Sequence, residues 1–239
     1  MDTQDKVGIL LKSDFVDYPA RIAAAVFLCG CNLRCPYCYN TEIVNKTVPL
    51  ENLVNCQQIL EHLEHRKKVL SGFVISGGEP LISPVTEFLI KEAKKIGYKV
   101  KLDTNGTFPE KLEKILENND LKPDFIALDV KTSPSRYNVL SPSGFSDLEK
   151  AIKKSINLIA SLPENQREYR TVLVPDLVTT YDIENIGKLL PKNATWKFAR
   201  FQNGECLSPK FSNLTPYTEE EYQTLLNIAL NFVTNSEIR

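Results

Sequence analysis

The chain has 239 residues, a formal net charge of −1 and 42% hydrophobic residues. This length suits one α/β domain with a substantial core. Acidic and basic residues are interspersed, so the charge pattern predicts neither nucleic acid nor an anionic membrane as a partner. No apolar run reaches the roughly 18 residues of a membrane span, and the polar start of the chain does not resemble a signal peptide. We therefore expect a single domain over residues 1–239 and a cytoplasmic location.

Short apolar runs alternate with amphipathic segments, which is typical of βα units and a parallel sheet. Strands are predicted at 22–28, 73–75, 98–102, 125–128, 169–174 and 195–201. Helices are predicted at 51–67, from the cap Ser83 to Gly97, at 109–117, at 147–160, at 182–190, and after a capping box that begins at Thr218. Residues 132–145, rich in serine and proline, are predicted to form a loop.

Polar motifs stand where four of these strands end. They are the cysteine loop after 22–28, Ser76–Pro80, Asp103–Gly106 and Asp129–Lys131. In parallel α/β folds, ligands bind at the carboxyl ends of the strands. The order of the motifs therefore predicts that they converge on one site.

Three cysteines, Cys31, Cys35 and Cys38, have the spacing C-x3-C-x2-C. In a reducing compartment such clusters indicate a metal or catalytic site. Three thiolates can bind three irons of a [4Fe–4S] cluster, and no fourth cysteine stands at a fitting distance, so the fourth iron would be open to a small molecule. A disulfide with a spare thiol, a zinc site with a fourth ligand elsewhere, and buried structural thiols are the alternatives, and this spacing favours each of them less.

The other cysteines and the two histidines favour structural roles. Cys29 is expected to be a buried thiol at a strand end, and Cys56 to lie on an apolar helix face with Leu53, Leu60 and Leu63. Cys206 is isolated in the sequence. His62 and His65 lie in a charged helical run, so a solvated face is the better interpretation than a metal site.

Together these motifs, with Asp17-Tyr18-Pro19 and Val174-Pro175, resemble the radical S-adenosylmethionine (SAM) enzymes from about residue 14 to about residue 221. Within them the chain is most similar to activases of glycyl-radical enzymes, above all the anaerobic ribonucleoside-triphosphate reductase activating proteins. The resemblance implies an α/β fold, a partial (β/α)6 TIM-like barrel. It also implies a [4Fe–4S] cluster and SAM as cofactors, with a monovalent cation in some activases.

The resemblance also implies site residues. Cys31, Cys35 and Cys38 would be the cluster ligands and the catalytic centre. The implied SAM contacts are Tyr37 at the adenine, Gly77, Gly78 and Glu79 at the amino group, Asp103, Thr104 and Asp129 at the ribose or, in some activases, at the cation, and Lys131 at the carboxylate. Further candidate SAM contacts, without an assigned group, are Asn40, Ser76, Asn105 and Gln202.

Several of these residues have a simpler interpretation as well. Tyr37 could be a core aromatic residue, the glycine pair an ordinary turn, and Asn105-Gly106 only a turn. Arg170 could face the site or the solvent.

An activase would reductively cleave SAM and use the 5′-deoxyadenosyl radical to take a hydrogen atom from a glycine α-carbon of a partner enzyme. Anaerobic ribonucleotide reductase is the first expected partner, and a flavodoxin or ferredoxin-type protein the expected electron donor. The alternatives are a radical SAM enzyme with a small-molecule substrate and a non-catalytic iron–sulfur or zinc protein. The chain departs from close relatives at Ala20-Arg21, at Tyr39, and in lacking a histidine near the last predicted strand.

Overall fold

The computed structural model describes residues 4–141 and 147–239. Contacts within the chain define two compact units, which are described separately below. The first comprises Met1–Asn32, Asn40–Thr104 and Glu110–Ile126; the second comprises Leu33–Tyr39, Asn105–Pro109 and Ala127–Arg239. The expectation of one domain over residues 1–239 stays a prediction.

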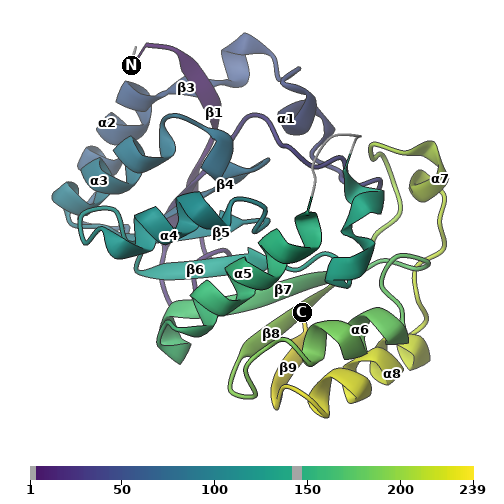
Figure 1. The fold of residues 1–239 in the computed structure, drawn as a ribbon. Coiled ribbons are helices and arrows are strands. Elements are labelled where there is room, and N and C mark those ends of the chain that lie inside the picture. The colour runs from purple at the N-terminus through teal and green to yellow at the C-terminus, as the bar shows by residue number, and fades with distance from the viewer. Residues whose placement is uncertain (1–3, 142–146) are drawn as a thin grey trace. The chain divides into compact units, whose positions relative to one another are not determined.

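The first unit contains a mixed sheet in the order β3-β1-β2-β4-β5 (Figure 1). Its strands are β1 (Lys6–Asp14), β2 (Ala23–Leu28), β3 (Val54–Asn55), β4 (Gly72–Gly77) and β5 (Lys99–Thr104). Strands β2, β4 and β5 are parallel, whereas β1 is antiparallel to both of its neighbours. The parallel strands bring Ser76 at the end of β4 beside Asp103 near the end of β5.

The helices of this unit connect the parallel strands. They are α1 (Thr41–Asn45), α2 (Cys56–Arg66), α3 (Thr86–Ile96) and α4 (Pro109–Glu117), with short 3₁₀ helices at Leu50–Asn52 and Pro80–Ile82. Helices α2 and α3 pack against each other, and α3 packs on β5. Helix α3 ends at Gly97 in the left-handed conformation, as predicted.

The second unit contains the parallel strands β7 (Arg167–Leu173), β8 (Thr195–Arg200) and β9 (Asn235–Ile238). Strand β6 (Phe125–Asp129) begins in the first unit and ends in the second. The helices are α5 (Leu148–Ala160), α6 (Thr180–Gly187), α7 (Pro209–Ser212) and α8 (Glu219–Leu230), with 3₁₀ helices at Pro134–Leu140 and Glu164–Gln166. Helix α8 begins with the predicted capping box of Thr218 and Glu221.

All six predicted strands are present, but three strands were missed. Strand β1 mixes polar and apolar residues and has mostly half-buried or exposed positions, so its sequence lacks a buried-strand signal. Strand β3 has two residues. Strand β9 is the polar segment Asn-Ser-Glu-Ile and is formed through pairing with β8.

Three further predictions were wrong in their detail. The helix predicted at 51–67 begins only at Cys56, because Asn55 and Gln58 form a capping box there. Its buried face contains Ile59 in place of Leu60. The helix predicted from Ser83 begins at Thr86, since Ser83 closes the preceding 3₁₀ turn.

The predicted loop at 132–145 is also partly wrong. Residues Pro134–Leu140 form a 3₁₀ helix, and residues 142–145 lie outside the described part of the chain. The predicted inward face of α5, by contrast, is confirmed: Leu148, Ile152, Ile156 and Ile159 are all buried.

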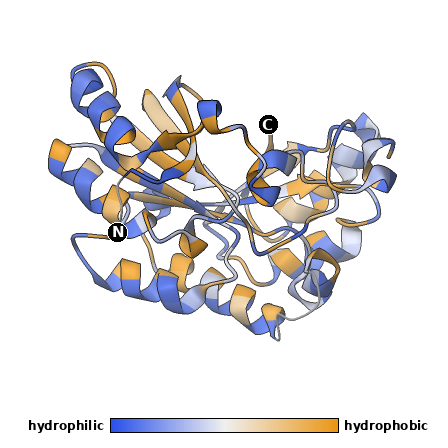
Figure 2. Ribbon diagram, turned by 90° about the horizontal axis from the view of Figure 1, so that it is seen from above, coloured by the Kyte–Doolittle hydropathy of each residue, from blue (hydrophilic) through white to orange (hydrophobic). Residues whose placement is uncertain are grey.

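The strands carry the apolar core, and the helices show their polar residues outward (Figure 2). In the first unit, Ala23 and Ala25 of β2 pack with Val74, Tyr18 and Phe125. Cys56 is fully buried, as predicted, whereas Cys29 is only half-buried. No helix in the described ranges is both long and apolar enough to cross a membrane.

Candidate active site

The cysteine loop follows β2 directly. Cys35 is buried, Cys31 and Cys38 are half-buried, and all six cysteines of the chain are free thiols. The amide of Cys38 donates to the carbonyl of Cys35 at 3.0 Å, which closes a turn between two predicted ligands. Cys31 belongs to the first unit, and the other two belong to the second.

Another segment supports the second part of this loop. The amides of Leu207 and Ser208 donate to the carbonyls of Cys38 and Pro36 at 3.1 and 2.9 Å. The segment after β8 is therefore hydrogen-bonded to the backbone around Cys38. Cys206, which is isolated from the other cysteines in the sequence, directly precedes these two residues. Gln202, in the same segment, is exposed.

The turn Gly77-Gly78-Glu79 presses against the start of the cysteine loop. The amide of Gly78 donates to the Leu28 carbonyl at 3.0 Å, and the amide of Glu79 donates to the Gly30 carbonyl at 2.9 Å. A Cβ atom on Gly78 would lie 2.0 Å from the Gly30 carbonyl oxygen. Gly77 has a φ of +122°, a backbone conformation that residues other than glycine rarely adopt. Both glycines are therefore needed for this close approach.

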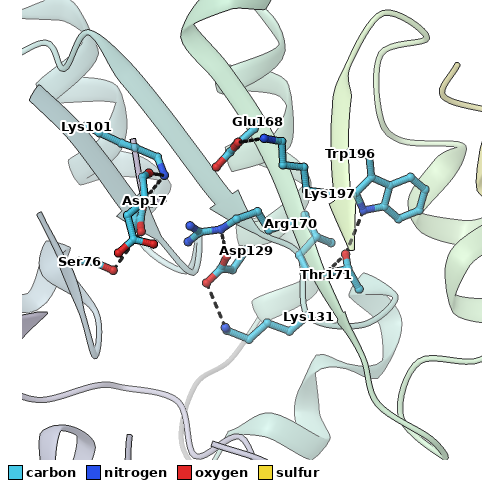
Figure 3. Close-up of polar contacts among 12 residues, drawn as sticks. Asp17, Ser76, Lys101, Asp129, Lys131, Glu168, Arg170, Thr171, Trp196 and Lys197 are labelled. Atoms are coloured by element: carbon cyan, nitrogen blue, oxygen red, sulfur yellow. Dashed lines mark hydrogen bonds and ion pairs between the residues drawn. The ribbon is translucent and has the colours of Figure 1, made fainter. Parts of the chain in front are cut away.

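A buried set of polar side chains lies at the ends of β4 and β5. In this Lys101 cluster, the Lys101 ammonium lies 3.2 Å from Oδ1 of Asp103, and Ser76 donates to Oδ2 at 3.0 Å. Lys101 also donates to the backbone carbonyl of Asp17 (Figure 3). Only 1% of the Lys101 side chain is exposed. The resulting closed ion pair joins the end of β5 to the Asp17-Tyr18-Pro19 loop.

Glu79 and Thr104 form a neighbouring pair in the same unit. Oε1 of Glu79 accepts from the Thr104 hydroxyl at 2.8 Å and from the Leu81 amide at 3.0 Å. The Glu79 side chain is buried. The structure thus brings together four residues predicted from different motifs: Ser76 with Asp103, and Glu79 with Thr104.

The second unit holds a separate set, the Asp129 cluster. Oδ1 of Asp129 accepts from Nε of Arg170 at 2.7 Å, and Oδ2 accepts from Nζ of Lys131 at 3.3 Å (Figure 3). The exposed fractions of the Asp129, Lys131 and Arg170 side chains are 30%, 19% and 14%. This cluster is more open than the Lys101 cluster. Arg170 is mostly buried and pairs with Asp129, and its facing the SAM site stays a prediction.

Charge pairing fixes the protonation of these groups. Burial would raise the pKa of Asp129, but Arg170 and Lys131 outweigh it and hold the pKa below its ordinary value. Burial would lower the pKa of Lys131, but the Asp129 carboxylate holds it well above its ordinary value. Asp129 is therefore a carboxylate and Lys131 an ammonium near neutral pH.

Two tyrosines adjoin this cluster. The hydroxyl of Tyr137 accepts from the Lys131 amide at 2.8 Å and donates to the Asp129 carbonyl at 3.5 Å. Tyr37 is 8% exposed, and its hydroxyl is buried with no hydrogen-bond partner in the part of the chain that the structure describes. Burial raises the pKa values of both phenols, so both are neutral.

A fully buried carboxylate, Asp182, holds the segment that follows Lys131. Oδ1 of Asp182 accepts from the Thr132 hydroxyl at 3.0 Å and from the Ser133 amide at 3.3 Å. Oδ2 accepts from Arg136 at 2.5 Å and from the amide and hydroxyl of Thr179 at 2.9 and 2.8 Å. Asp182 therefore connects the start of α6 to the turn between Lys131 and Tyr137.

Two other predicted residues, Asn105 and Asn40, have local partners, and so does Arg200. Asn105 accepts from the amide and hydroxyl of Thr107, so it forms a turn. Asn40 precedes α1, and its carbonyl accepts from the Val44 amide. Arg200 at the end of β8 pairs with Glu219 and lies 4.7 Å over the Tyr222 ring. Any SAM contact by Asn40, Asn105 or Gln202 stays a prediction.

Sequence reasoning missed Lys101, Tyr137 and Asp182. A signal existed for Lys101. It stands two residues before Asp103, and side chains two residues apart on a strand point to the same face of the sheet. From the sequence, Asp182 is only the first residue of the helix predicted at 182–190. Its pairing with residues 132–136, about 50 positions away, has no local signature.

The donor set fits a [4Fe–4S] cluster and a SAM-like ligand. Free thiols supply soft ligands, and the glycine turn lets the backbone come close to a ligand. The buried Tyr37 hydroxyl has no hydrogen-bond partner among the described residues and could donate to a ligand. In the described ranges, no three histidine, cysteine or acidic side chains converge as a site for one metal ion. A four-iron cluster distributes its thiolates over different irons, so the three cysteine ligands stay a prediction. Asp103 already has a counter-charge in Lys101, which weakens the case for a monovalent cation beside it.

Comparison with known proteins finds a matching family and several relatives. The family model of the radical SAM superfamily matches residues 26–177. A Methanocaldococcus jannaschii protein, assigned by inference as a glycyl-radical enzyme activating enzyme, is 31% identical over 94% of this chain and 91% of that protein. The pyruvate formate-lyase-activating enzyme of Clostridium pasteurianum is 34% identical over 73% of this chain and 70% of that protein.

Two further similarities are to proteins with other names. The 7-carboxy-7-deazaguanine synthase of Aquifex aeolicus is 36% identical over 37% of this chain and 38% of that protein. The crystal structure of QueE from Escherichia coli matches with a TM-score of 0.56 and 14% identity, over 98% of this chain and 93% of that chain. This likeness confirms the predicted fold class, a partial TIM-like α/β barrel. The chain therefore belongs to the radical SAM superfamily: it is an enzyme of the group that includes the glycyl-radical enzyme activating enzymes, and its cofactors are a [4Fe–4S] cluster and SAM.

Proposed function

We propose that this enzyme activates a partner protein by taking a hydrogen atom from the α-carbon of one of its glycines, leaving a glycyl radical and 5′-deoxyadenosine. The observation that carries the proposal is the 31% identity to an activating enzyme over nearly the full length of both chains. The similarity to pyruvate formate-lyase-activating enzyme supports the same chemistry. Anaerobic ribonucleotide reductase is the first partner to test, with a flavodoxin or ferredoxin-type protein as electron donor.

In this proposal Cys31, Cys35 and Cys38 are the cluster ligands. When bound, the cluster supplies the electron that cleaves SAM. The glycine turn at 77–78 lets backbone approach the SAM amino group, and Glu79 accepts from it. Asp103, Thr104 and Asp129 hold the ribose, and Lys131 holds the carboxylate.

The chain's own task is to orient these groups and to keep water away. The Lys101 cluster and the Asp182 contacts fix the strand ends on which the binding residues stand. Since each of these anchors is buried, the binding residues are held before a ligand arrives.

The first experiment is anaerobic cluster reconstitution followed by incubation with SAM, dithionite and the purified partner. We expect 5′-deoxyadenosine by chromatography, a glycyl-radical signal by electron paramagnetic resonance, and loss of both in Cys35→Ala. The matched control is Cys56→Ala, since Cys56 is a buried thiol at the start of α2. SAM cleavage with no radical on any glycyl-radical partner would refute the activase proposal.

A second candidate function is a radical SAM reaction on a small molecule. The similarity to a 7-carboxy-7-deazaguanine synthase favours it, although it covers only 37% of this chain. The two candidates differ in the fate of the hydrogen atom. With a partner deuterated at glycine, label recovered in 5′-deoxyadenosine supports the activase, whereas label-free product formed equally well without any protein partner supports the small-molecule reaction.

A further inference from the structure

The C-terminal end of α1 lies against the start of the cysteine loop. The amide of Gly30 donates to the carbonyl of Ile43 at 2.8 Å, and Gly30 has a φ of +97°. Gly30 directly precedes Cys31, the first predicted cluster ligand. The residue that caps the end of α1 is therefore placed close to this ligand.

That residue is Lys46, and its backbone conformation is unusual. Lys46 has a φ of 58° and a ψ of 38°, which lie in the left-handed region. Glycine is the usual residue at such a helix end, because a side chain in this conformation costs free energy. A lysine held there is a reason to look for a function of its side chain.

The Lys46 side chain lies across Gly30. A Cβ atom on Gly30 would lie 2.6 Å from Cε and 3.4 Å from Nζ of Lys46. The ammonium is thus held beside the residue next to Cys31. Lys46 is exposed, and within residues 4–141 and 147–239 it forms no ion pair that would neutralise its charge.

A positive charge beside an iron–sulfur cluster favours the reduced form of that cluster. Reduction by one electron adds one negative charge, and a nearby cation stabilises the added charge. The net charge around a cluster is accordingly one of the properties that set its reduction potential. Lys46 meets the two conditions for this effect, a position beside a ligand and an unneutralised charge.

We propose that Lys46 raises the reduction potential of the [4Fe–4S] cluster by holding its ammonium beside Cys31, and so eases the transfer of one electron from an external donor. Lys46 acts through the cluster and does not contact the substrate. The inference rests on Cys31 as a cluster ligand and is independent of which protein or small molecule the enzyme acts on.

The test is an anaerobic redox titration of the reconstituted protein. Dithionite supplies the electrons, and electron paramagnetic resonance measures the reduced fraction of the cluster at each potential. Lys46→Met removes the charge and keeps most of the side-chain length. We expect the ratio of reduced to oxidised cluster at a fixed potential to fall about threefold, which for a one-electron couple is a midpoint lower by about 28 mV. The midpoint is independent of the amount of cluster loaded, so partial reconstitution does not affect it.

Two further variants separate the charge of Lys46 from its backbone conformation. Lys46→Arg keeps the charge and should keep the wild-type midpoint. Lys46→Gly suits the left-handed backbone, so the protein should be at least as stable as the wild type, yet its midpoint should fall as in Lys46→Met. A wild-type midpoint in Lys46→Met or in Lys46→Gly overturns the proposal. A midpoint lowered equally in Lys46→Arg also overturns it.

Lys95→Met is the matched control for net charge. Lys95 is an exposed lysine near the end of α3, shortly before β5 begins. Because β2, β4 and β5 are parallel, Lys95 lies toward the end of the sheet opposite the cysteine loop. This variant should keep the wild-type midpoint. A shift as large as that of Lys46→Met would show that any lost charge has this effect, and the proposal would be overturned.

The outcome is separable from that of the proposed function. Midpoints that shift as expected, in a protein that forms no glycyl radical on any partner, refute the activase proposal alone. A wild-type protein that activates its partner, with an unshifted midpoint in Lys46→Met, refutes the role of Lys46 alone.

Discussion

The Lys101 cluster and the Asp129 cluster each pair an aspartate with a lysine, and they differ in how exposed these side chains are. Lys101 is 1% exposed, and its ammonium forms an ion pair with Asp103 and donates a hydrogen bond to the Asp17 carbonyl. Asp129 is 30% exposed, and the neighbouring Tyr37 hydroxyl lacks a partner in the described chain. A fully buried pair contributes chiefly to stability, whereas a more exposed set of charged side chains can also contribute to binding. The two clusters should therefore respond differently to mutation.

The largest effect should come from Lys101→Met. The substitution keeps the apolar length and removes the ammonium that pairs with the buried Asp103 carboxylate. Breaking a buried ion pair costs about 3–5 kcal/mol of unfolding free energy, and urea unfolding would measure it.

Lys99→Met is the control for that variant. Lys99 lies on the same strand and pairs with Asp124 at 2.6 Å, but it is 54% exposed. An exposed pair is worth about 1 kcal/mol or less. Equal losses in the two variants would show that burial does not distinguish Lys101.

Asp182→Ala should have the next largest effect. Asp182 is fully buried and accepts hydrogen bonds from Thr132, Ser133, Arg136 and Thr179. Arg136 is 32% exposed and can return to water, so we expect a loss of roughly 3 kcal/mol, somewhat less than for Lys101. Because the segment after Lys131 is released, SAM affinity should fall as well. A stability loss with full SAM affinity would show that Asp182 only caps α6.

How far the sequence predicts this molecule depends on the range of the interactions. Helix α8 follows from four adjacent residues, because the Thr218 capping box is a local signal. The end of α3 at Gly97 is local too. Strand β9 and the Asp182 contacts depend on partners about 40 to 50 residues away in the sequence. No pattern in the residues next to β9 or Asp182 indicates which residues those partners are. The strand-end motifs were found because each is local, but the openness of one cluster and the closure of the other were not predictable.

The openness of the Asp129 cluster can be tested through pH. The pKa of Asp129 is held below its ordinary value of 3.8 by Arg170 and Lys131, against the effect of burial. A carboxylate with a lowered folded-state pKa stabilises the protein above its unfolded pKa, and this stabilisation is lost as the pH falls through the lowered value.

We therefore expect Asp129→Asn to cost about 2 kcal/mol of unfolding free energy at pH 7. The difference from the wild type should be constant down to about pH 4 and should shrink below it. Urea unfolding at a series of pH values measures it. A difference that grows with acidity would mean that Asp129 is not the paired group.

The smallest effect should come from a position outside both clusters. The Thr218 hydroxyl accepts from the Glu221 amide at 3.3 Å, and the Glu221 carboxylate accepts from the Thr218 amide at 2.7 Å. Thr218→Ala removes one half of this box and should cost about 1 kcal/mol of unfolding free energy, with no change in the affinity for SAM. Thr218→Ser keeps the hydroxyl and should restore the stability. Thr218→Ala could instead weaken SAM binding as much as Asp182→Ala does. Loss of SAM affinity would then accompany any loss of stability in this chain, and the distinction between the stabilising Lys101 cluster and a binding Asp129 cluster would fail.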